Sequence, residues 1–284
     1  MIRFGPSGNS NSFYNDGNKR SEQAFAWLAK NGLNAYEYSF GRGINIGEEK
    51  AVLMAIESQK YDIQISVHAP YYINFANPAE EMINKSISYL INSAKKLKKL
   101  GGDRVVFHPA TVGKLTRQEA LCLAKKNFEK LLNEIYSNDL NDVYFCPETM
   151  GKINQIGDEI EIANLVAMDK CLLPTMDFGH LNARTLGGLK TQDDFCRIID
   201  NVANIIGEEK TKNMHVHFSC IEYSKGGEVR HLTFDDQIYG PSYKNFLNVV
   251  SKYNLSPVII CESDGTQAED AKTMQDYFKQ ISNL

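Results

Sequence analysis

The sequence predicts a single (β/α)₈ TIM barrel, and three observations lead to this prediction. Short apolar runs alternate with longer segments of helical periodicity along the whole length, as repeated βα units require. The chain has 284 residues, close to the ~250 that are typical of such barrels. No Pro/Ser-rich linker, low-complexity tract or shift in composition divides it. We therefore expect one domain over residues 1–284 rather than two smaller ones.

Eight segments carry the short period-2 or continuous apolar pattern of strands. In order they are 2–5, 35–40, 62–69, 104–109, 143–148, 173–177, 214–219 and 257–262. Helical periodicity is clearest at 80–100, where Ile83, Ile87 and Leu90 belong to one apolar stripe, and at 119–135. The Gly101-Gly102 pair is expected to end the first of these helices as a C-cap.

A doubly wound α/β fold is the main alternative architecture. That fold would place a Gly-x-Gly-x-x-Gly turn after the first strand to hold a nucleotide phosphate. The chain has Gly5-Pro6-Ser7-Gly8 at this point, which does not match the pattern. The closed barrel is therefore favoured.

Composition and charge exclude several classes of protein. Hydrophobic residues make up 43% of the chain and charged residues 23%, which suits a soluble globular protein and not a disordered chain. The net charge of −4 gives no general attraction to nucleic acid or to an anionic membrane, so binding to nucleic acid would need a local basic rim. The basic residues that follow expected strands are Lys114, Lys152, Arg184, Lys225 and Arg230.

Neither export nor membrane insertion is expected. The first residues lack a basic segment followed by a long apolar one, and no apolar run reaches the length of about 18 residues that a membrane span requires. The six cysteines are widely separated and form no Cys-x-x-Cys pair, which fits reduced thiols rather than a disulfide framework. We therefore expect a cytoplasmic protein.

Metal-binding side chains gather where the expected strands end. The six histidines lie on strand ends or just after them, together with acidic residues. His68 and His108, His108 and Glu148, and Asp177 and His217 are each 40 residues apart, about the length of one βα unit. Barrel enzymes place their chemistry at this C-terminal rim. The residues expected to converge there are His68, His108, Glu148, Asp177, His180, His217, His231 and Glu262.

A ring of imidazoles and carboxylates predicts a metal site for Zn²⁺ or Mn²⁺. Glu148 and Glu262 each follow an apolar run, where an unpaired buried carboxylate would cost several kcal/mol, so a bound cation explains them best. His215 and His217 share a strand face because side chains alternate with period 2. His217 is nearer the strand end and is the better ligand, whereas His215 is expected behind the ligands or in the core.

Five motifs at these strand ends occur in the same order along the chain as in a known family. They are 66–74 (SVHAPYYIN), 106–109 (VFHP), 147–151 (PETMG), 176–180 (MDFGH), and His217 followed by Arg230-His231. This set resembles endonuclease IV, the apurinic/apyrimidinic endonuclease of the xylose isomerase-like TIM barrels, from about residue 2 to residue 280. The resemblance implies a DNA-repair hydrolase with about two to three Zn²⁺ per chain, or Mn²⁺ in their place. It would cleave the phosphodiester 5′ to an abasic site and leave a 3′-hydroxyl.

The resemblance groups the donors around three zinc ions, with Glu148 as the bridge between the first two. The groups are His68 and His108 for the first zinc, Asp177, His217 and Glu262 for the second, and His180 and His231 for the third. Glu148 and Glu262 would be the catalytic carboxylates. Zinc can activate water near neutral pH and neutralise the leaving 3′-oxygen, so no side-chain base is required.

The resemblance also implies a DNA-binding surface. Tyr71 and Tyr72 match a wedge that enters the duplex at the lesion, and Arg42 matches an intercalating arginine. The partner would be abasic double-stranded DNA, and the enzyme is expected to be a monomer. Tyrosines in a barrel loop also commonly act as lid or packing residues. A lid or packing role for Tyr71 and Tyr72 therefore stays open beside the DNA wedge.

The sequence departs from the family at the third zinc. The family has an aspartate ligand just before the Arg-His pair, where this chain has Val229 preceded by Glu228. We expect Glu228 to ligate the third metal or to hold one of its waters, because its side chain is one methylene longer than that of aspartate. Val229 is expected to turn away and pack against the barrel rim.

Two other functions remain open. A sugar isomerase or epimerase of the same superfamily needs one divalent metal. Its donors would be Glu148, Asp177, His217 and Glu262. A non-catalytic barrel that binds a sugar phosphate or a damaged DNA end would agree with Val229. The additional histidines favour the nuclease over both.

Overall fold

Eight parallel strands close into a barrel, which confirms the predicted (β/α)₈ fold. The computed structural model describes residues 1–282. The sheets have the orders β1-β12-β9-β8 and β2-β3-β4-β6, and parallel bridges from Ser7 to Glu37 and from Glu148 to Thr175 join them on both sides. The barrel strands are β1 (Arg3–Pro6), β2 (Ala35–Ser39), β3 (Gln64–His68), β4 (Arg104–Phe107), β6 (Tyr144–Pro147), β8 (Thr175–Asp177), β9 (His215–Phe218) and β12 (Val258–Cys261).

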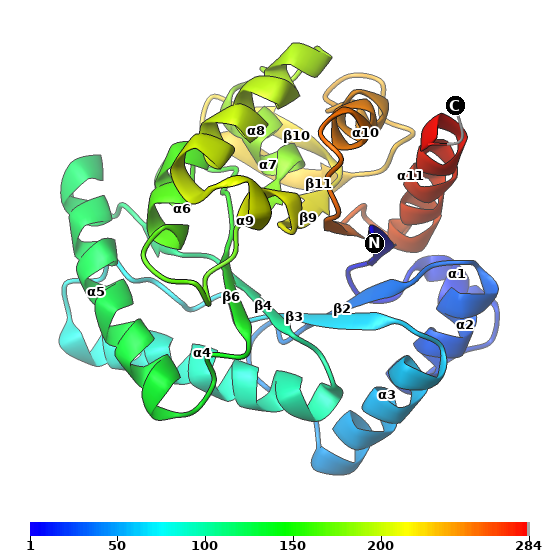
Figure 1. The fold of residues 1–284 in the computed structure, drawn as a ribbon, viewed down its shortest axis with the longest axis horizontal. Helices are drawn as coiled ribbons and strands as arrows, with labels where there is room; N and C mark the ends of the chain where they lie inside the picture. The colour runs from blue at the N-terminus through cyan, green and yellow to red at the C-terminus, as the bar shows by residue number, and fades with distance from the viewer. Residues whose placement is uncertain (283–284) are drawn as a thin grey trace.

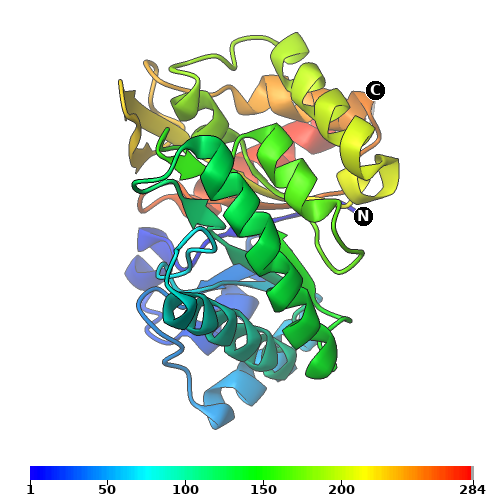
Figure 2. The same cartoon turned by 90° about the vertical axis from the view of Figure 1, so that its left-hand side faces the viewer.

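Helices surround the barrel, as two views at right angles show (Figures 1 and 2). The longer ones are α2 (Ala24–Lys30), α3 (Glu48–Lys60), α4 (Glu80–Leu100), α5 (Arg117–Ser137), α6 (Glu159–Val166), α7 (Phe178–Arg184), α8 (Gln192–Ile206), α10 (Tyr243–Lys252) and α11 (Gln267–Ser282). The short ones are α1 (Asn11–Asn15), α9 (Glu208–Lys212) and the 3₁₀ helix η1 (Ser21–Gln23). Within residues 1–282, no helix combines the length and the apolarity that crossing a membrane requires.

The two long predicted helices are present. In α4, Ile83, Ile87 and Leu90 are buried in the main core. Gly101 ends α4 in the left-handed conformation, with φ of 75°, which a residue without a Cβ adopts easily. The helix predicted at 119–135 is longer, because Thr116 and Glu119 form a capping box that starts α5 at Arg117.

Seven of the eight barrel strands are shorter than predicted, and β1 keeps the predicted length but begins one residue later. The segment predicted at 62–69, for example, forms a strand only over Gln64–His68. Ile63 lies outside the strand and is still buried, so an apolar pattern overestimates strand length. The predicted donors keep their places nevertheless, because His68 is the last residue of β3 and Asp177 the last of β8.

Side chains on β9 alternate between the outer core and the barrel interior. Val216 and Phe218 join the main core with the helices. His215 and His217 are fully buried and contact Glu37 of β2 across the interior. The barrel interior therefore carries polar groups below its C-terminal rim.

Two small antiparallel sheets follow barrel strands in the chain. β5 (Ala110–Thr111) pairs with β7 (Gln155–Ile156), and β10 (Cys220–Ser224) pairs with β11 (Gly227–Leu232). The second pair, hereafter the β10–β11 hairpin, stands where the sequence predicts only a long loop. Ser224 pairs with Gly227, so Lys225 and Gly226 form the turn of the hairpin; glycine at such a position is a common turn signal.

Candidate metal centre

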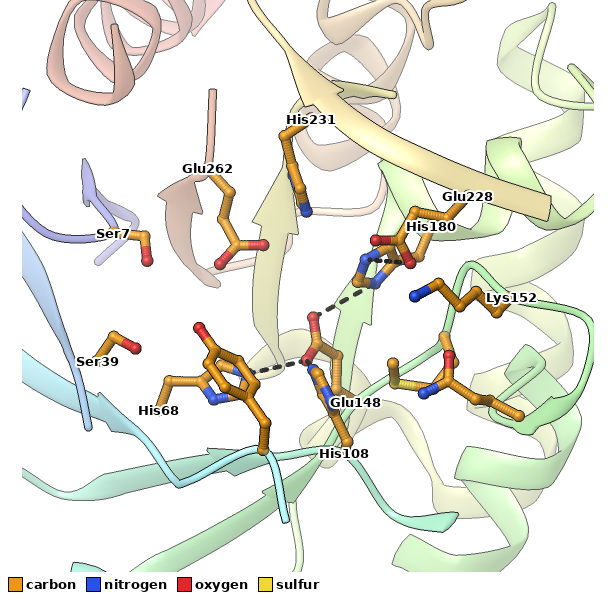
Figure 3. Close-up of a pocket in the computed structure, with 13 residues that line it drawn as sticks. Ser7, Ser39, His68, His108, Glu148, Lys152, His180, Glu228, His231 and Glu262 are labelled. Carbon is orange, nitrogen blue, oxygen red and sulfur yellow. Dashed lines mark hydrogen bonds and ion pairs between the residues drawn. The ribbon is translucent and has the colours of Figure 1, made fainter. Parts of the chain in front are cut away.

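The predicted donors converge at the C-terminal end of the barrel. A cavity of about 440 Å³ opens there, and Figure 3 shows the side chains that line it. Asp177 and His217 are fully buried and join the same groups of donor atoms. The donors that line the cavity are His68, His108, Glu148, His180, Glu228, His231 and Glu262.

The first cluster consists of His68, His108 and Glu148, which come from the ends of β3, β4 and β6. Nε2 of His68 lies 3.2 Å from Oε2 of Glu148, and Nε2 of His108 lies 3.3 Å from the same oxygen. One ligand atom from each residue fits within 4.8 Å of the others. The three side chains could therefore hold one metal ion.

The second cluster consists of Glu148, Asp177, His217 and Glu262, and it adjoins the first. Nδ1 of His217 lies 2.9 Å from Oε1 of Glu148 and 3.4 Å from Oε2 of Glu262. Glu148 thus directs one oxygen to each cluster. This geometry suits a carboxylate that bridges two ions.

The third cluster consists of His180, Glu228 and His231. His180 lies on α7, directly after β8, whereas the other two lie on the β10–β11 hairpin. Nε2 of His180 is 3.4 Å from Oε2 of Glu228, and the rings of His180 and His231 are 5.6 Å apart between centroids. Glu228 is thus placed beside the histidines of the third cluster (Figure 3).

A β-bulge brings the two hairpin donors to the same side. Glu228 and His231 are three positions apart, so on a regular strand they would point to opposite faces. The register of the hairpin shifts between Glu222 and Tyr223, which leaves Val229 without a partner residue in the ladder. Such an extra residue changes the alternation by one, and Glu228 and His231 both line the cavity.

The prediction that Val229 packs against the barrel rim is wrong. Val229 is the bulged residue and is 51% exposed to solvent. A bulge turns its extra residue out of the ladder, so Val229 takes no part in the cavity lining.

Gly227 docks the hairpin against the loop after β6. A Cβ at Gly227 would lie 2.1 Å from the carbonyl oxygen of Gly151, and its φ of +90° is one that other residues rarely adopt. We therefore expect Gly227→Ala to displace the hairpin and to reduce the metal bound by the third cluster. Metal content per chain measures the loss.

Gly226→Ala is the matched control for that variant. Its added Cβ would meet only Oγ of Ser224, at 3.9 Å, in ordinary van der Waals contact. Gly226→Ala should keep the wild-type metal content. Equal metal content in the two variants would contradict the docking role of Gly227.

The protein fixes which nitrogen of two imidazoles faces the cavity. Nδ1 of His68 is 2.9 Å from the carbonyl oxygen of Ala69, and Nδ1 of His180 is 2.9 Å from that of Thr149. A carbonyl oxygen only accepts hydrogen bonds, so both Nδ1 atoms carry a proton. In each neutral ring Nε2 then presents a lone pair to a carboxylate of its own cluster. A metal cation between them would satisfy both groups.

The buried carboxylates of the clusters also indicate a site for a metal cation. Oδ2 of Asp177 is buried and accepts no hydrogen bond among residues 1–282, and its nearest charged neighbour is Nδ1 of His180 at 3.1 Å. Burial raises the pKa of Asp177 to about 6. Burial would also raise the pKa of Glu148, but neighbouring histidines, above all His217, hold it well below its usual range.

The histidines show the complementary effect. Burial opposes protonation of His217, but Glu262, Glu37 and Glu148 together raise its pKa well above the ordinary value. Protons on imidazoles and a metal cation are therefore alternative ways to neutralise the same carboxylates. The donors are imidazoles and carboxylates without a thiolate, a set that suits Zn²⁺ or Mn²⁺. The residues present thus fit the metal that the sequence predicts.

The structure separates the residues predicted to contact DNA. Tyr71 lines the cavity, and its ring centroid is 5.7 Å from that of His68. Tyr72 lies beside Tyr89 of α4, with 6.1 Å between ring centroids. Arg42 is exposed in the loop after β2 and lies outside the cavity lining. Of the three, only Tyr71 is next to the metal donors.

Two of the predicted basic rim residues have partners within the protein. Arg184 donates hydrogen bonds to carbonyl oxygens of residues 150–155, so it fastens this segment and does not contribute a free charge to a basic rim. Arg230 pairs with Glu222, at 2.6 Å between Nε and Oε2. The other three, Lys114, Lys152 and Lys225, are exposed, and Lys152 lines the cavity.

Sequence analysis missed Glu37, which is fully buried beneath the second cluster. A signal was present, because Glu37 places a charged side chain in the middle of the strand expected at 35–40. It also missed two hydroxyl groups that line the cavity, those of Ser7 and Ser39. Both serines follow or end short strands, where a lone serine carries no chemical signature.

Fold and site together define a class of protein, a (β/α)₈ barrel with clusters of histidine and carboxylate donors at the C-terminal ends of its strands. Residues 25–281 match the model of the xylose isomerase-like TIM barrel family. The chain belongs to this family, in agreement with the resemblance seen in its motifs.

Curated relatives include proteins with and without a named activity. An uncharacterized protein of Methanocaldococcus jannaschii is 34% identical over 250 residues, which are 88% of this chain and 89% of the relative. The probable endonuclease 4 of Staphylococcus carnosus is 31% identical over 161 residues, which are 55% of this chain and 52% of that protein. The second match therefore spans about half of each chain.

Solved structures of two differently named proteins share the fold. Endonuclease IV from Thermus thermophilus superposes with a TM-score of 0.73 at 16% identity, over 98% of this chain and 99% of that one. A D-tagatose 3-epimerase-like protein gives a TM-score of 0.74 at 19% identity, over 99% and 98% of the two chains. At these identities the likeness establishes the fold alone.

Proposed function

We propose that this protein is a metal-dependent phosphodiesterase that incises double-stranded DNA on the 5′ side of abasic sites, with Zn²⁺ as its metal and Mn²⁺ as a substitute. One observation carries the proposal: three clusters of imidazole and carboxylate donors adjoin in one cavity. Phosphodiester cleavage benefits from several metal ions, which stabilise the attacking and the leaving oxygen. A reaction at one metal would need only the second cluster and would leave His68, His108 and His180 without a role.

The relatives support the same activity. The Staphylococcus carnosus relative carries the name endonuclease 4, and the Thermus thermophilus structure is an endonuclease IV. The fold itself is shared with an epimerase-like protein. The additional histidines, rather than the barrel, therefore favour the nuclease.

Different residues of this chain would hold the metals and contact the substrate. Glu148 would hold the first and second metals with its two oxygens, and Glu262 would complete the second. Bound zinc would activate water near neutral pH and neutralise the charge on the leaving oxygen. Tyr71, beside His68, would cover the reacting phosphate. Lys152 would contact a phosphate near the lesion.

An incision assay tests this proposal. The substrate is a labelled duplex with one abasic site, and the same duplex without the lesion is the control. We expect a single cut 5′ to the lesion that leaves a 3′-hydroxyl and that a strong chelator abolishes. Added salt should weaken cleavage because it screens phosphate contacts. Absence of incision with zinc and with manganese would overturn the proposal.

A single-metal sugar isomerase or epimerase is the second candidate. The second cluster alone supplies two glutamates, an aspartate and a histidine. The hydroxyl groups of Ser7 and Ser39 line the same cavity and could bind sugar hydroxyls. Conversion of ketoses or aldoses without DNA incision would favour this candidate. Binding of abasic DNA or a sugar phosphate without turnover would indicate a non-catalytic barrel.

Glu228→Ala tests the third metal. We expect it to lower metal content from about three toward two ions per chain and to reduce the rate of incision, because His180 and His231 alone bind a metal weakly. Val229→Ala is the matched control, since Val229 is half exposed next to Glu228 and does not line the cavity. If Glu228→Ala equals the wild type in metal content and rate, the third cluster does not bind metal through Glu228.

A further inference from the structure

Glu37 is a buried carboxylate one layer below the metal donors. It lies in the middle of β2 and is 0% exposed, as are His215 and His217 on the opposite side of the barrel interior. Glu37 pairs with Ser66 in the register of β2 and β3, two residues before His68. A carboxylate at this depth is costly unless its oxygens have partners.

The two oxygens of Glu37 face different partners. Oε2 accepts a hydrogen bond from Oγ of Ser66 at 2.8 Å and lies 3.0 Å from Nε2 of His215. Oε1 forms an ion pair with Nε2 of His217 at 2.9 Å, and neither atom has another hydrogen-bond partner among residues 1–282. Ser66 and His215 thus hold one oxygen, which leaves the other beside Nε2 of His217.

The contact between Glu37 and His217 determines which nitrogen of His217 presents a lone pair to the second cluster. A carboxylate 2.9 Å from Nε2 favours a proton on that nitrogen. In the neutral ring the lone pair is then on Nδ1, the nitrogen that lies 2.9 Å from Glu148 and 3.4 Å from Glu262. Carboxylates commonly orient metal-binding histidines in this way.

We propose that Glu37, held by Ser66 and His215, is a positioning residue that fixes His217 with Nδ1 toward the metal of the second cluster. The proposal rests on the metal site of the proposed function. It also explains His215, which is too deep to reach the cavity lining and instead contacts Glu37 from the same strand face as His217.

Two substitutions test the proposal. Glu37→Leu removes the acceptor with little change in volume, and we expect zinc affinity at His217 to fall by about 10- to 100-fold. Glu37→Gln keeps an oxygen that can accept from Nε2, so it should retain most of the affinity. Affinity is measured by zinc titration against a competing chelator, with the ¹⁵N shifts of the His217 ring as the readout specific to the second cluster.

The Nε2–H resonance of His217 in the zinc-loaded protein is a second readout. We expect a slowly exchanging signal in the wild type, a shifted signal in Glu37→Gln because the acceptor is neutral, and loss of the signal in Glu37→Leu. Glu161→Gln is the control, because Glu161 is also buried but accepts from Arg117 and from the backbone of Gly157 instead. It should change neither readout.

The outcomes separate this proposal from the proposed function. Wild-type affinity and an unchanged resonance in Glu37→Leu would overturn the positioning role alone. Should Glu37→Leu not fold, an unshifted resonance in Glu37→Gln would overturn it. Weakened zinc binding in Glu37→Leu together with a wild type that does not incise DNA would support the positioning role and overturn the nuclease. A wild type that binds no zinc would overturn both.

Discussion

Glu148→Gln is expected to reduce incision of abasic DNA by at least about 10³-fold, equivalent to about 4 kcal/mol of transition-state stabilisation, while the barrel stays folded. Glu148 lies within 3.3 Å of a nitrogen in the first cluster and 2.9 Å of one in the second. The amide would keep the size of the side chain but lose one of its two anionic ligand oxygens. Both clusters would therefore lose affinity together.

Three measurements decide the Glu148 prediction. Incision rate is compared with metal content by elemental analysis and with the thermal unfolding midpoint. Glu161→Gln is again the control, since it replaces a buried carboxylate outside the donor clusters. Turnover at the wild-type rate in folded, metal-loaded Glu148→Gln would refute a bridging role for Glu148.

Removal of the metal is the second prediction with a large effect. A strong chelator should stop incision and also lower the unfolding midpoint, because the buried carboxylates lose their cation. At free zinc 100 times above Kd, each occupied site would add about 2.7 kcal/mol to the free energy of unfolding. At about 2–4 °C per kcal/mol for a chain of this size, the midpoint should fall by roughly 5–10 °C per site.

Zinc added back should restore both the incision activity and the unfolding midpoint. Mg²⁺ at the same concentration is the control, because it prefers oxygen ligands and suits imidazole poorly. An unfolding midpoint that does not respond to chelator or to zinc would contradict a metal-binding role for the donor clusters.

The position of the donors around the rim was predictable from sequence because the βα unit has a nearly constant length. Spacings of 40 residues put His68, His108 and Glu148 on successive barrel strands, and parallel strands share one C-terminal rim. Glu37 was not predictable in the same way. Its partner His215 is 178 positions away, and no local pattern links two residues that meet across a barrel.

The hairpin marks another limit of pattern analysis. Alternation assigns a side to every residue of a strand, but one bulge reverses the assignment beyond it. Val229 was expected to pack against the barrel rim, and as the bulged residue it is instead exposed. Arg184 was counted among the residues of a basic rim, but its carbonyl partners lie at 150–155 in another loop, which no local pattern links to it.

The support under the third cluster differs from that under the other two. β10 and β11 pair with each other and with none of the barrel strands in residues 1–282. The hairpin is attached through loop contacts instead, among them hydrogen bonds from Glu228 N–H to the carbonyl oxygen of Gly151 and from Ile153 N–H to that of Gly226. Elements attached in this way open at a lower free energy than a closed barrel unfolds. Such opening would move Glu228 and His231 away from His180, which lies on α7. We therefore expect an ion at the third cluster to exchange with solution faster than ions beside Glu148, with a residence time set by opening of the hairpin.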